Sequence, residues 1–391
     1  MNTFKKIDDN FVANTYTRFN VELVKGKGSY LYDVNGKEYI DLNSGIAVNT
    51  FGISDKVWAK AVKKQLGKLQ HASNLYYTEP CALLAKTLCD KTGAKKVFFS
   101  NSGAEANECA IKCARLWASN NKGKEYFNVI TLKNSFHGRT ITTLSANGQE
   151  VFHKDFTPLT EGFLYAEPND LNGLEELLKQ NKCAGILMEL VQGEGGVLPL
   201  DKDFVLGVKK LCDKYNVLLM IDEVQTGNGR TGTLYAYQQF GIIPDVVSTA
   251  KGLGGGLPLG ATIFFEKTEN VLTAGLHGST FGGNPVATAG ALSIIQRLTP
   301  EFLSEINKKS EYIFSELSGA KGVKSVSGLG LMIGIETVGD AGKIIADCIA
   351  KGVLPIKAKN KVRLLPALNI PWDTLKIAVE ILKQTIKENC Q

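Results

Sequence analysis

Short apolar runs alternate with helical patterns between about residues 95 and 265. Each run has the length of a strand and is rich in β-branched or large apolar side chains, which predicts a strand buried on both faces. The runs are KVFFS, NVITL, AGILMEL, VLLMID, DVVST and ATIFF. Strands and helices that alternate in this way predict an α/β fold, with a mostly parallel central sheet covered by helices on both faces.

The segment ahead of these strands predicts an N-terminal arm. Asn35-Gly36 lies between the strand-like runs YLYDV and KEYIDL, and this dipeptide favours the tight turn of a hairpin. A helical pattern follows over about 55–69. We expect this segment, residues 1–70, to pack with a smaller domain formed by the C-terminal part.

The C-terminal part predicts that smaller α+β domain. After Asn284-Pro285 a helical pattern runs to about residue 318, and the strand-like runs VKSVSG, LMIGIE and VRLLP then mix with helices. The chain closes on the amphipathic segment WDTLKIAVEILKQTIKEN. The predicted division is therefore an arm over 1–70, a large domain over 71–284, and an interdomain helix with the small domain over 285–391.

Composition narrows the class of protein without choosing a ligand. The chain has 391 residues, 44% of them hydrophobic and 21% charged, which is typical of a globular protein of more than one domain. Its 45 basic and 39 acidic residues are scattered, so we interpret the net charge of +6 as a solvated surface and expect no nucleic-acid partner. A secretory leader and an apolar stretch of about 18 residues are both missing, which predicts a cytoplasmic protein without membrane contact.

The cysteines and histidines do not predict a metal site. Most of the eight cysteines lie within apolar patterns, so we expect reduced core thiols. Cys109 and Cys113 are four residues apart on one predicted helix face, but no histidine pair or second cysteine pair accompanies them.

Unusual polar motifs follow the predicted strands, where ligands bind in open α/β sheets. The run KVFFS leads into Asn101-Ser102-Gly103-Ala104 and then into a helical pattern. Free N–H groups at such a helix start make an anion site. An ordinary serine cap followed by a tight turn explains the same residues, so this motif alone leaves both interpretations open.

Two ionisable residues follow neighbouring strands of the predicted sheet. Asp222 ends the run VLLMID, where an unpaired carboxylate is costly, and Lys251 follows DVVST directly ahead of several glycines. Each alone is compatible with a structural ion pair or a solvated side chain. Together they are the two groups that pyridoxal phosphate chemistry requires: an amine that forms a Schiff base and an acid that keeps the pyridine nitrogen protonated.

At this point the sequence resembles a known family, the class III pyridoxal-phosphate-dependent aminotransferases, and in particular their acetylornithine aminotransferase branch. The resemblance implies the fold of PLP-dependent transferases of fold type I. The motifs that carry it occur in the family's order across most of the chain: NSGIAVNTFG (43–52), SNSGAEANECAIKCAR (100–115), SFHGRT (135–140), ELVQGEGG (189–196), DEVQTGNGRTG (222–232), PDVVSTAKGLGGGLPLGA (244–261), HGSTFGGNPVA (277–287) and VRLLPALNI (362–370).

The resemblance implies one pyridoxal 5'-phosphate per subunit, held as a Schiff base on Lys251. Ser102 with the backbone of Gly103 and Ala104 would cradle the phosphate, and Phe136 would lie against the ring. Asp222 would hold the ring nitrogen and Gln225 the ring hydroxyl, with Glu223 and Val224 beside them. Thr280 would reach the phosphate of the partner subunit, which implies a homodimer.

The resemblance also implies the substrate contacts. Arg139, with Ser279 nearby, would bind the donor's carboxylate, and Arg363 would bind the α-carboxylate of 2-oxoglutarate, since a guanidinium holds a carboxylate through two hydrogen bonds. Glu194 would neutralise Arg363 while an ω-amine is bound and would move aside for the dicarboxylate. One pocket would then serve two unlike substrates.

The reaction implied is a ping-pong transfer of the δ-amino group of N2-acetyl-L-ornithine to 2-oxoglutarate. Its products are N-acetyl-L-glutamate 5-semialdehyde and L-glutamate, a step of arginine biosynthesis. Sibling enzymes that act on ornithine, succinylornithine, succinyldiaminopimelate or 4-aminobutyrate remain alternatives, because they would keep Lys251, Asp222 and an arginine clamp. A glutamate-semialdehyde aminomutase and a non-enzymatic binding protein on the same fold are more distant alternatives. A dinucleotide site fits worse, because GLGGG lacks the third glycine of that fingerprint.

Two positions depart from the family pattern. Relatives usually continue the first motif with a Gly-His-x-His-Pro sequence, where this chain has Gly52-Ile53-Ser54-Asp55, and they often have Glu-Pro at Glu189-Leu190. The first departure lies near the expected substrate side of the pocket and bears on donor preference.

Overall fold

A computed structural model describes residues 4–390. The helices are α1 (Phe4–Phe11), α2 (Ser44–Ala47), α3 (Lys56–Leu66), α4 (Glu79–Thr92), α5 (Gly103–Asn121), α6 (Ile141–Ala146), α7 (Leu171–Gln180), α8 (Lys202–Tyr215), α9 (Tyr237–Phe240), α10 (Pro285–Ile295), α11 (Pro300–Leu317), α12 (Ala341–Ala350) and α13 (Trp372–Glu388). The strands are β1 (Leu23–Lys27), β2 (Tyr30–Asp33), β3 (Glu38–Asp41), β4 (Lys96–Ser100), β5 (Asn128–Leu132), β6 (Phe163–Ala166), β7 (Cys183–Met188), β8 (Val191–Gln192), β9 (Leu198–Pro199), β10 (Leu218–Asp222), β11 (Val246–Thr249), β12 (Gly260–Phe264), β13 (Val323–Leu329), β14 (Met332–Thr337), β15 (Val353–Leu354), β16 (Ile356–Ala358) and β17 (Lys361–Leu364).

The central sheet confirms the predicted α/β fold. Its strand order is β4-β12-β11-β10-β7-β5-β6, and all six predicted strands belong to it. The sheet is parallel except for β12, which runs antiparallel to both β11 and β4. The seventh strand, β6, was not predicted. It is a short edge strand whose residues are mostly only half-buried, so it lacks the continuous apolar run that identifies the others.

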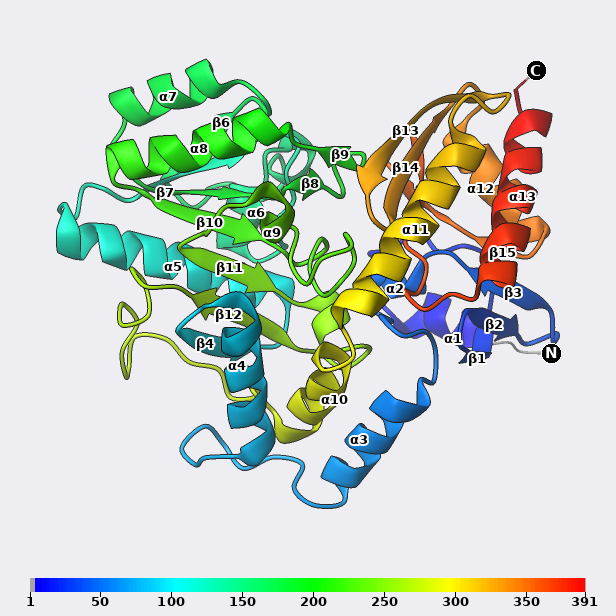
Figure 1. Cartoon of the computed structure of the whole chain (residues 1–391), viewed down its shortest axis with the longest axis horizontal. Coiled ribbons are helices and arrows are strands. Elements are labelled where there is room, and N and C mark those ends of the chain that lie inside the picture. Colours follow the sequence, from blue (N-terminus) through cyan, green and yellow to red (C-terminus); the bar gives the residue numbers. More distant parts are fainter. Residues whose placement is uncertain (1–3, 391) are drawn as a thin grey trace.

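Side chains of β10 explain why its sequence has no polar face. Leu218 and Met220 pack in the apolar cluster that contains α5, while Leu219 and Ile221 pack in the larger cluster that contains α8. Successive residues of a strand point to opposite faces, so helices on both faces require apolar residues throughout. Figure 1 shows these helices around the central sheet.

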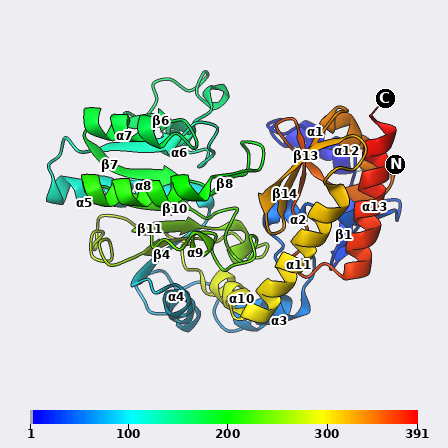
Figure 2. The same cartoon turned by 45° about the horizontal axis from the view of Figure 1, so that its top comes forward.

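The N-terminal segment forms the predicted hairpin and helix. β2 and β3 pair antiparallel around Gly36, whose φ of 81° suits glycine at the turn. β3 also pairs in parallel with β15, through Ile40 and Val353, so this sheet contains a strand from the other end of the chain. The N-terminal strands therefore lie beside the C-terminal part, as Figures 1 and 2 show.

The C-terminal part corrects one expectation. The helical pattern that the sequence extends from 285 to about 318 is two helices, α10 and α11, because Pro300 has no N–H to continue the first helix and instead begins the second. Beyond them, β13-β14-β17-β16 form a small sheet that packs with α11, α12 and α13. The domain boundaries at 70 and 284 stay a prediction; the contacts between β3 and β15 are compatible with it.

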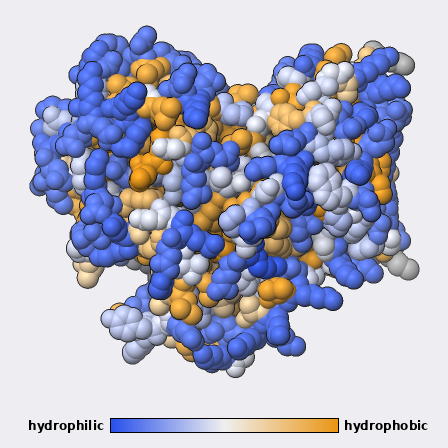
Figure 3. Space-filling view, viewed as in Figure 1, coloured by the Kyte–Doolittle hydropathy of each residue, from blue (hydrophilic) through white to orange (hydrophobic). Residues whose placement is uncertain are grey.

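The face seen in Figure 3 is largely hydrophilic, and it is hollowed between the central-sheet region and the C-terminal part. All eight cysteines are free thiols, five of them buried. Within residues 4–390, no group of side chains has the composition of a metal site. Over the same range, no helix is both long enough and apolar enough to cross a bilayer.

Candidate active site

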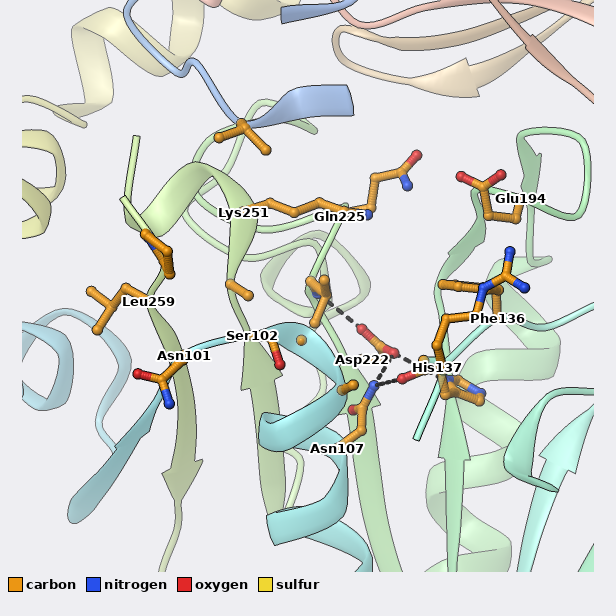
Figure 4. A pocket seen from close by; sticks show the side chains of 18 of the residues that line it. Asn101, Ser102, Asn107, Phe136, His137, Glu194, Asp222, Gln225, Lys251 and Leu259 are labelled. Atoms are coloured by element: carbon orange, nitrogen blue, oxygen red, sulfur yellow. Dashed lines mark hydrogen bonds and ion pairs between the residues drawn. The ribbon is translucent and has the colours of Figure 1, made fainter. Parts of the chain in front are cut away.

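A cavity of about 440 Å³ lies at the carboxyl edge of the central sheet (Figure 4). It falls within the size range of small-molecule sites. Ten residues singled out from the sequence line it: Ser102, Gly103, Ala104, Phe136, Arg139, Glu194, Asp222, Val224, Gln225 and Lys251. Four polar lining residues had been given no role from the sequence, namely Asn101, Asn107, His137 and Glu189.

Asp222 is fixed deep in this cavity by a network of hydrogen bonds. It ends β10, and its side chain is only 4% exposed. Asn107 Nδ2 donates to Asp222 Oδ2 over 2.7 Å, and the backbone N–H of Val224 donates to Oδ1 over 2.9 Å. His137 Nδ1 lies 2.8 Å from Oδ2, within hydrogen-bond distance. The carboxylate therefore keeps a fixed orientation.

The network extends beyond Asp222 to neighbouring elements. Asn107 on α5 also donates to the backbone carbonyl of His137, and its Oδ1 accepts a bond from Ser248 on β11. His137 Nε2 is buried without a hydrogen-bond partner among the described residues. A sequence signal for Asn107 existed, because it interrupts the buried face of α5, but only the fold identifies the carboxylate that it serves.

The start of α5 faces the cavity. Ser102 caps the helix by accepting from the N–H of Glu105, and the first N–H groups of a helix have no partner inside it. A Cβ atom at Gly103 would come within 2.6 Å of Val224, so only glycine allows the helix to start this close to the loop after Asp222. The predicted anion site is thus a helix N-terminus held against the Asp222 segment.

Lys251 follows β11 and begins a short 3₁₀ turn that ends at Leu253. β11 is the parallel neighbour of β10, and Asp222 pairs with Ser248, so Lys251 and Asp222 emerge at the same sheet edge. Burial lowers the pKa of the Lys251 amine, which favours the neutral, nucleophilic form. Its φ of 46° is left-handed, an uncommon conformation for a residue with a side chain.

Phe136 and Arg139 lie on the side of the cavity formed by the loop after β5. The Phe136 ring packs edge-on against Phe152, with ring centres 5.6 Å apart. The Arg139 guanidinium lies 5.4 Å from the centre of Phe136 and 4.5 Å from that of Phe152. Arg139 is exposed and has no carboxylate partner within residues 4–390, so it is available to an anionic ligand.

Arg363 comes from the small sheet and lies behind the cavity, where it bonds two residues that line it. It lies in β17, and its Nη1 donates to Glu194 Oε1 over 2.7 Å and to Gln225 Oε1 over 3.2 Å. Burial acts to raise the pKa of Glu194, but the charge of Arg363 and its hydrogen bond, together with the Lys251 charge and a hydrogen bond from Gln225, hold that pKa below its ordinary value. Glu194 is therefore ionised, and the pair joins residues that are 169 positions apart.

Four residues singled out from the sequence do not line the cavity: Arg363, described above, and Glu223, Ser279 and Thr280. Glu223 is buried, accepting from the Thr226 hydroxyl and from the N–H of Tyr237, so its carboxylate has partners elsewhere. Ser279 is half-buried and accepts a bond from Asn101, which does line the cavity. Thr280 is exposed on the same turn.

The departure at Gly52-Ile53-Ser54-Asp55 has a structural explanation. Asp55 caps α3 through the N–H of Trp58 and pairs with both terminal nitrogens of Arg297, at 2.8 and 3.1 Å. The Arg297 guanidinium in turn lies 3.7 Å from the centre of the Phe51 ring. None of these residues lines the cavity, so the departure changes the packing behind the site.

Comparison with known proteins agrees with this geometry. The family model described as aminotransferase class-III matches residues 11–386. An acetylornithine aminotransferase from Haemophilus ducreyi is 48% identical over 98% of each chain, and a succinylornithine transaminase from Citrobacter koseri is 45% identical over 89% of this chain and 88% of its own. A solved ornithine aminotransferase from Toxoplasma gondii, with PLP at partial occupancy in its active site, has a TM-score of 0.94 at 30% identity and covers 99% of this chain and 94% of its own.

Proposed function

The chain belongs to the class-III aminotransferases, and from this premise we propose that it transfers the δ-amino group of N2-acetyl-L-ornithine to 2-oxoglutarate. The products are N-acetyl-L-glutamate 5-semialdehyde and L-glutamate, as in arginine biosynthesis. The observation that carries the proposal is the Arg363–Glu194 ion pair in contact with the cavity that also contains Lys251.

The residues of the cavity fit pyridoxal phosphate. A buried lysine of lowered pKa, an aspartate held by three hydrogen-bond partners, and a helix N-terminus all line one space. Lys251 would hold the cofactor covalently, Asp222 its ring nitrogen, and Ser102, Gly103 and Ala104 its phosphate. Gln225 would bond the ring hydroxyl and Phe136 would cover one ring face.

When bound, pyridoxal phosphate supplies an electron sink for the carbon that bears the transferred amine. Asp222 contributes a fixed negative charge that keeps a bonded nitrogen protonated, and His137 and Asn107 prevent it from turning away. Lys251, when its amine is free, is the base of the cavity that can take and return a proton.

Arg139 and Arg363 would bind the substrate carboxylates. Arg139 is unpaired and exposed among the described residues, so it suits the carboxylate of the amino donor. Glu194 already neutralises the charge of Arg363. A donor whose far end is uncharged or cationic is therefore not exposed to an unpaired positive charge there. A dicarboxylate would displace Glu194 and take its place, which gives the ping-pong order in one pocket.

A homodimer is part of the proposal. Thr280 is exposed and lies off its own chain's cavity, in line with a role at the phosphate of a partner subunit. Ser279 lies on the same turn and would contribute at the substrate side of that site.

Succinylornithine is the second candidate donor, because the Citrobacter koseri relative is only slightly less similar. Both donors carry an acylated α-amine, and they differ by one carboxylate. The site residues are common to both, so the choice depends on the measured specificity.

The test is the visible absorption of the purified protein supplied with pyridoxal phosphate. N-acetylornithine at the lowest concentration of any donor should abolish the band of the lysine-bound cofactor, and 2-oxoglutarate should restore it. Ornithine, succinylornithine, succinyldiaminopimelate and 4-aminobutyrate are the comparison donors. Lys251→Ala should lose both the band and nearly all turnover. If no visible band forms, the enzyme assignment fails; if another donor acts at lower concentration, only the substrate changes.

A further inference from the structure

Glu189 is a buried carboxylate that the proposed reaction does not use. It follows β7, lines the cavity and is 6% exposed. Its two oxygens accept from backbone N–H groups of two separate loops: Oε1 from Phe136 over 2.9 Å and Oε2 from Gly193 over 3.0 Å. An acceptor group between two loops fixes the position of one loop relative to the other.

Each loop that Glu189 holds carries a residue of the proposed site. The first carries Phe136, at the ring face, and His137, which bonds Asp222. The second carries Glu194, directly after Gly193, and so determines where the partner of Arg363 lies. One carboxylate therefore connects the cofactor side of the cavity to its substrate side.

The second loop has little freedom to take another position. A Cβ atom at Gly193 would come within 2.6 Å of the Gln225 amide, so the backbone of this loop packs directly on a side chain that bonds Arg363. Burial raises the pKa of Glu189, so placing a carboxylate here costs free energy. A costly buried charge on the wall of a cavity is typical of a functional position.

We propose that Glu189 is a positioning residue for substrate alternation: its two hydrogen bonds fix the Glu194 loop relative to the Phe136 loop, so that Glu194 neutralises Arg363 while the amino donor is bound. The inference rests on the proposed function, and it assigns to Glu189 a role in discriminating donor from acceptor.

The first test uses hydrogen–deuterium exchange of the cofactor-free protein, so that it does not depend on activity. In Glu189→Ala both N–H groups lose their acceptor, and the amides of Phe136 and Gly193 should exchange at least tenfold faster. In Glu189→Gln the side-chain amide can accept from only one of them, so only one loop should be affected. Glu305→Gln changes an exposed carboxylate on α11 in the same way and should leave both loops unchanged.

The second test separates the two half-reactions by rapid mixing. Glu189→Gln should lower kcat/KM for the amino donor at least tenfold more than kcat/KM for 2-oxoglutarate, because only the donor needs Arg363 neutralised. Glu194→Gln should shift the same ratio in the same direction. In the double variant the two shifts should not add, because Glu189 acts through Glu194.

The outcomes are distinguishable from failure of the proposed function. If the unaltered protein transfers no amino group, the proposed function fails, while the exchange experiment still tests the two hydrogen bonds. Unchanged exchange in both variants would overturn the inference. So would faster exchange with an unchanged ratio of donor to acceptor kcat/KM, since that result describes a merely structural residue.

Discussion

The two ends of the cavity are built differently. At the deep end, Asp222 accepts three hydrogen bonds, all from the central-sheet part, and its side chain is 4% exposed. At the other end, Arg363 comes from the small sheet and depends mainly on Glu194, whose side chain is 33% exposed. Several hydrogen bonds fix the position of the carboxylate at the deep end, whereas the other end depends chiefly on one ion pair between two parts of the chain.

The difference corresponds to what each end is proposed to do. A cofactor is the same in both half-reactions, so a rigid carboxylate that needs no reorganisation suits it. The substrates alternate, so the opposite end needs a charge that can be exposed or covered. When the pair opens, water can solvate the partially exposed Glu194, but the buried Arg363 guanidinium needs another carboxylate in its place, and the acceptor substrate supplies one.

Removing the charge at the deep end should have the largest effect. Asp222→Asn keeps the shape and most of the hydrogen bonds, but it no longer keeps a ring nitrogen protonated. We expect kcat to fall about 1,000-fold, or about 4 kcal/mol, with a small change in KM, measured by steady-state kinetics. Asp213→Asn, an exposed aspartate paired with Lys209, is the matched control. A loss below tenfold would mean that the deep end is not where the charge matters.

The second prediction concerns a stability cost beside Asp222. Burial raises the pKa of Glu223 to about 7. A raised pKa means that the folded state favours the protonated carboxyl, so the penalty develops as pH rises above the unfolded value and is complete above about pH 7. Glu223→Gln has no such penalty. From pH 5 to pH 8 its free energy of unfolding should therefore gain about 2–3 kcal/mol relative to the unaltered protein, as measured by urea titration at each pH. A difference independent of pH would contradict the raised pKa.

Weakening the Arg363 end of the cavity should have the smallest effect of the three changes, and it should affect one substrate only. Arg363→Lys keeps the positive charge but loses the planar pair of donors that binds a carboxylate through two bonds. We expect KM for 2-oxoglutarate to rise about 30-fold, or about 2 kcal/mol, with the donor half-reaction changed less than threefold. The donor half-reaction serves as the internal control. Equal losses in both halves would show that the two ends are not independent.

The sequence alone could predict the residues that follow strands. Asp222 and Lys251 each end an apolar run, and neighbouring parallel strands bring such residues to one edge. Glu189 follows a strand in the same way, directly after β7, but its role depends on backbone groups of two other loops. Asn107 and His137 do not follow a strand directly, and their partners come from other segments. The hairpin at Gly36 was predictable from local turn chemistry, whereas the break before Pro300 was covered by a helical pattern on both sides.

The Arg363–Glu194 contact could not be predicted from local sequence patterns. Its partners are 169 residues apart, Arg363 in β17 and Glu194 in the turn between β8 and β9, so only the resemblance to a family suggested it. For Asp55 the resemblance did not suggest the contact. The family pattern suggested only that the segment lies near the substrate side of the pocket. Its pairing with Arg297 followed from the packing of α3 against α10, which no local pattern encodes.

The reversed strand β12 has a consequence for biosynthesis. β4, the edge strand that leads into the turn at Ser102, pairs with β12 alone in the central sheet, and Ser100 meets Gly260, 160 residues later. At about 5–20 residues per second, a ribosome needs about 8–30 seconds to supply that partner. The turn at Ser102 is therefore synthesised well before the strand that holds β4 in the sheet. It can take its final position only after β12 has been synthesised and has paired with β4.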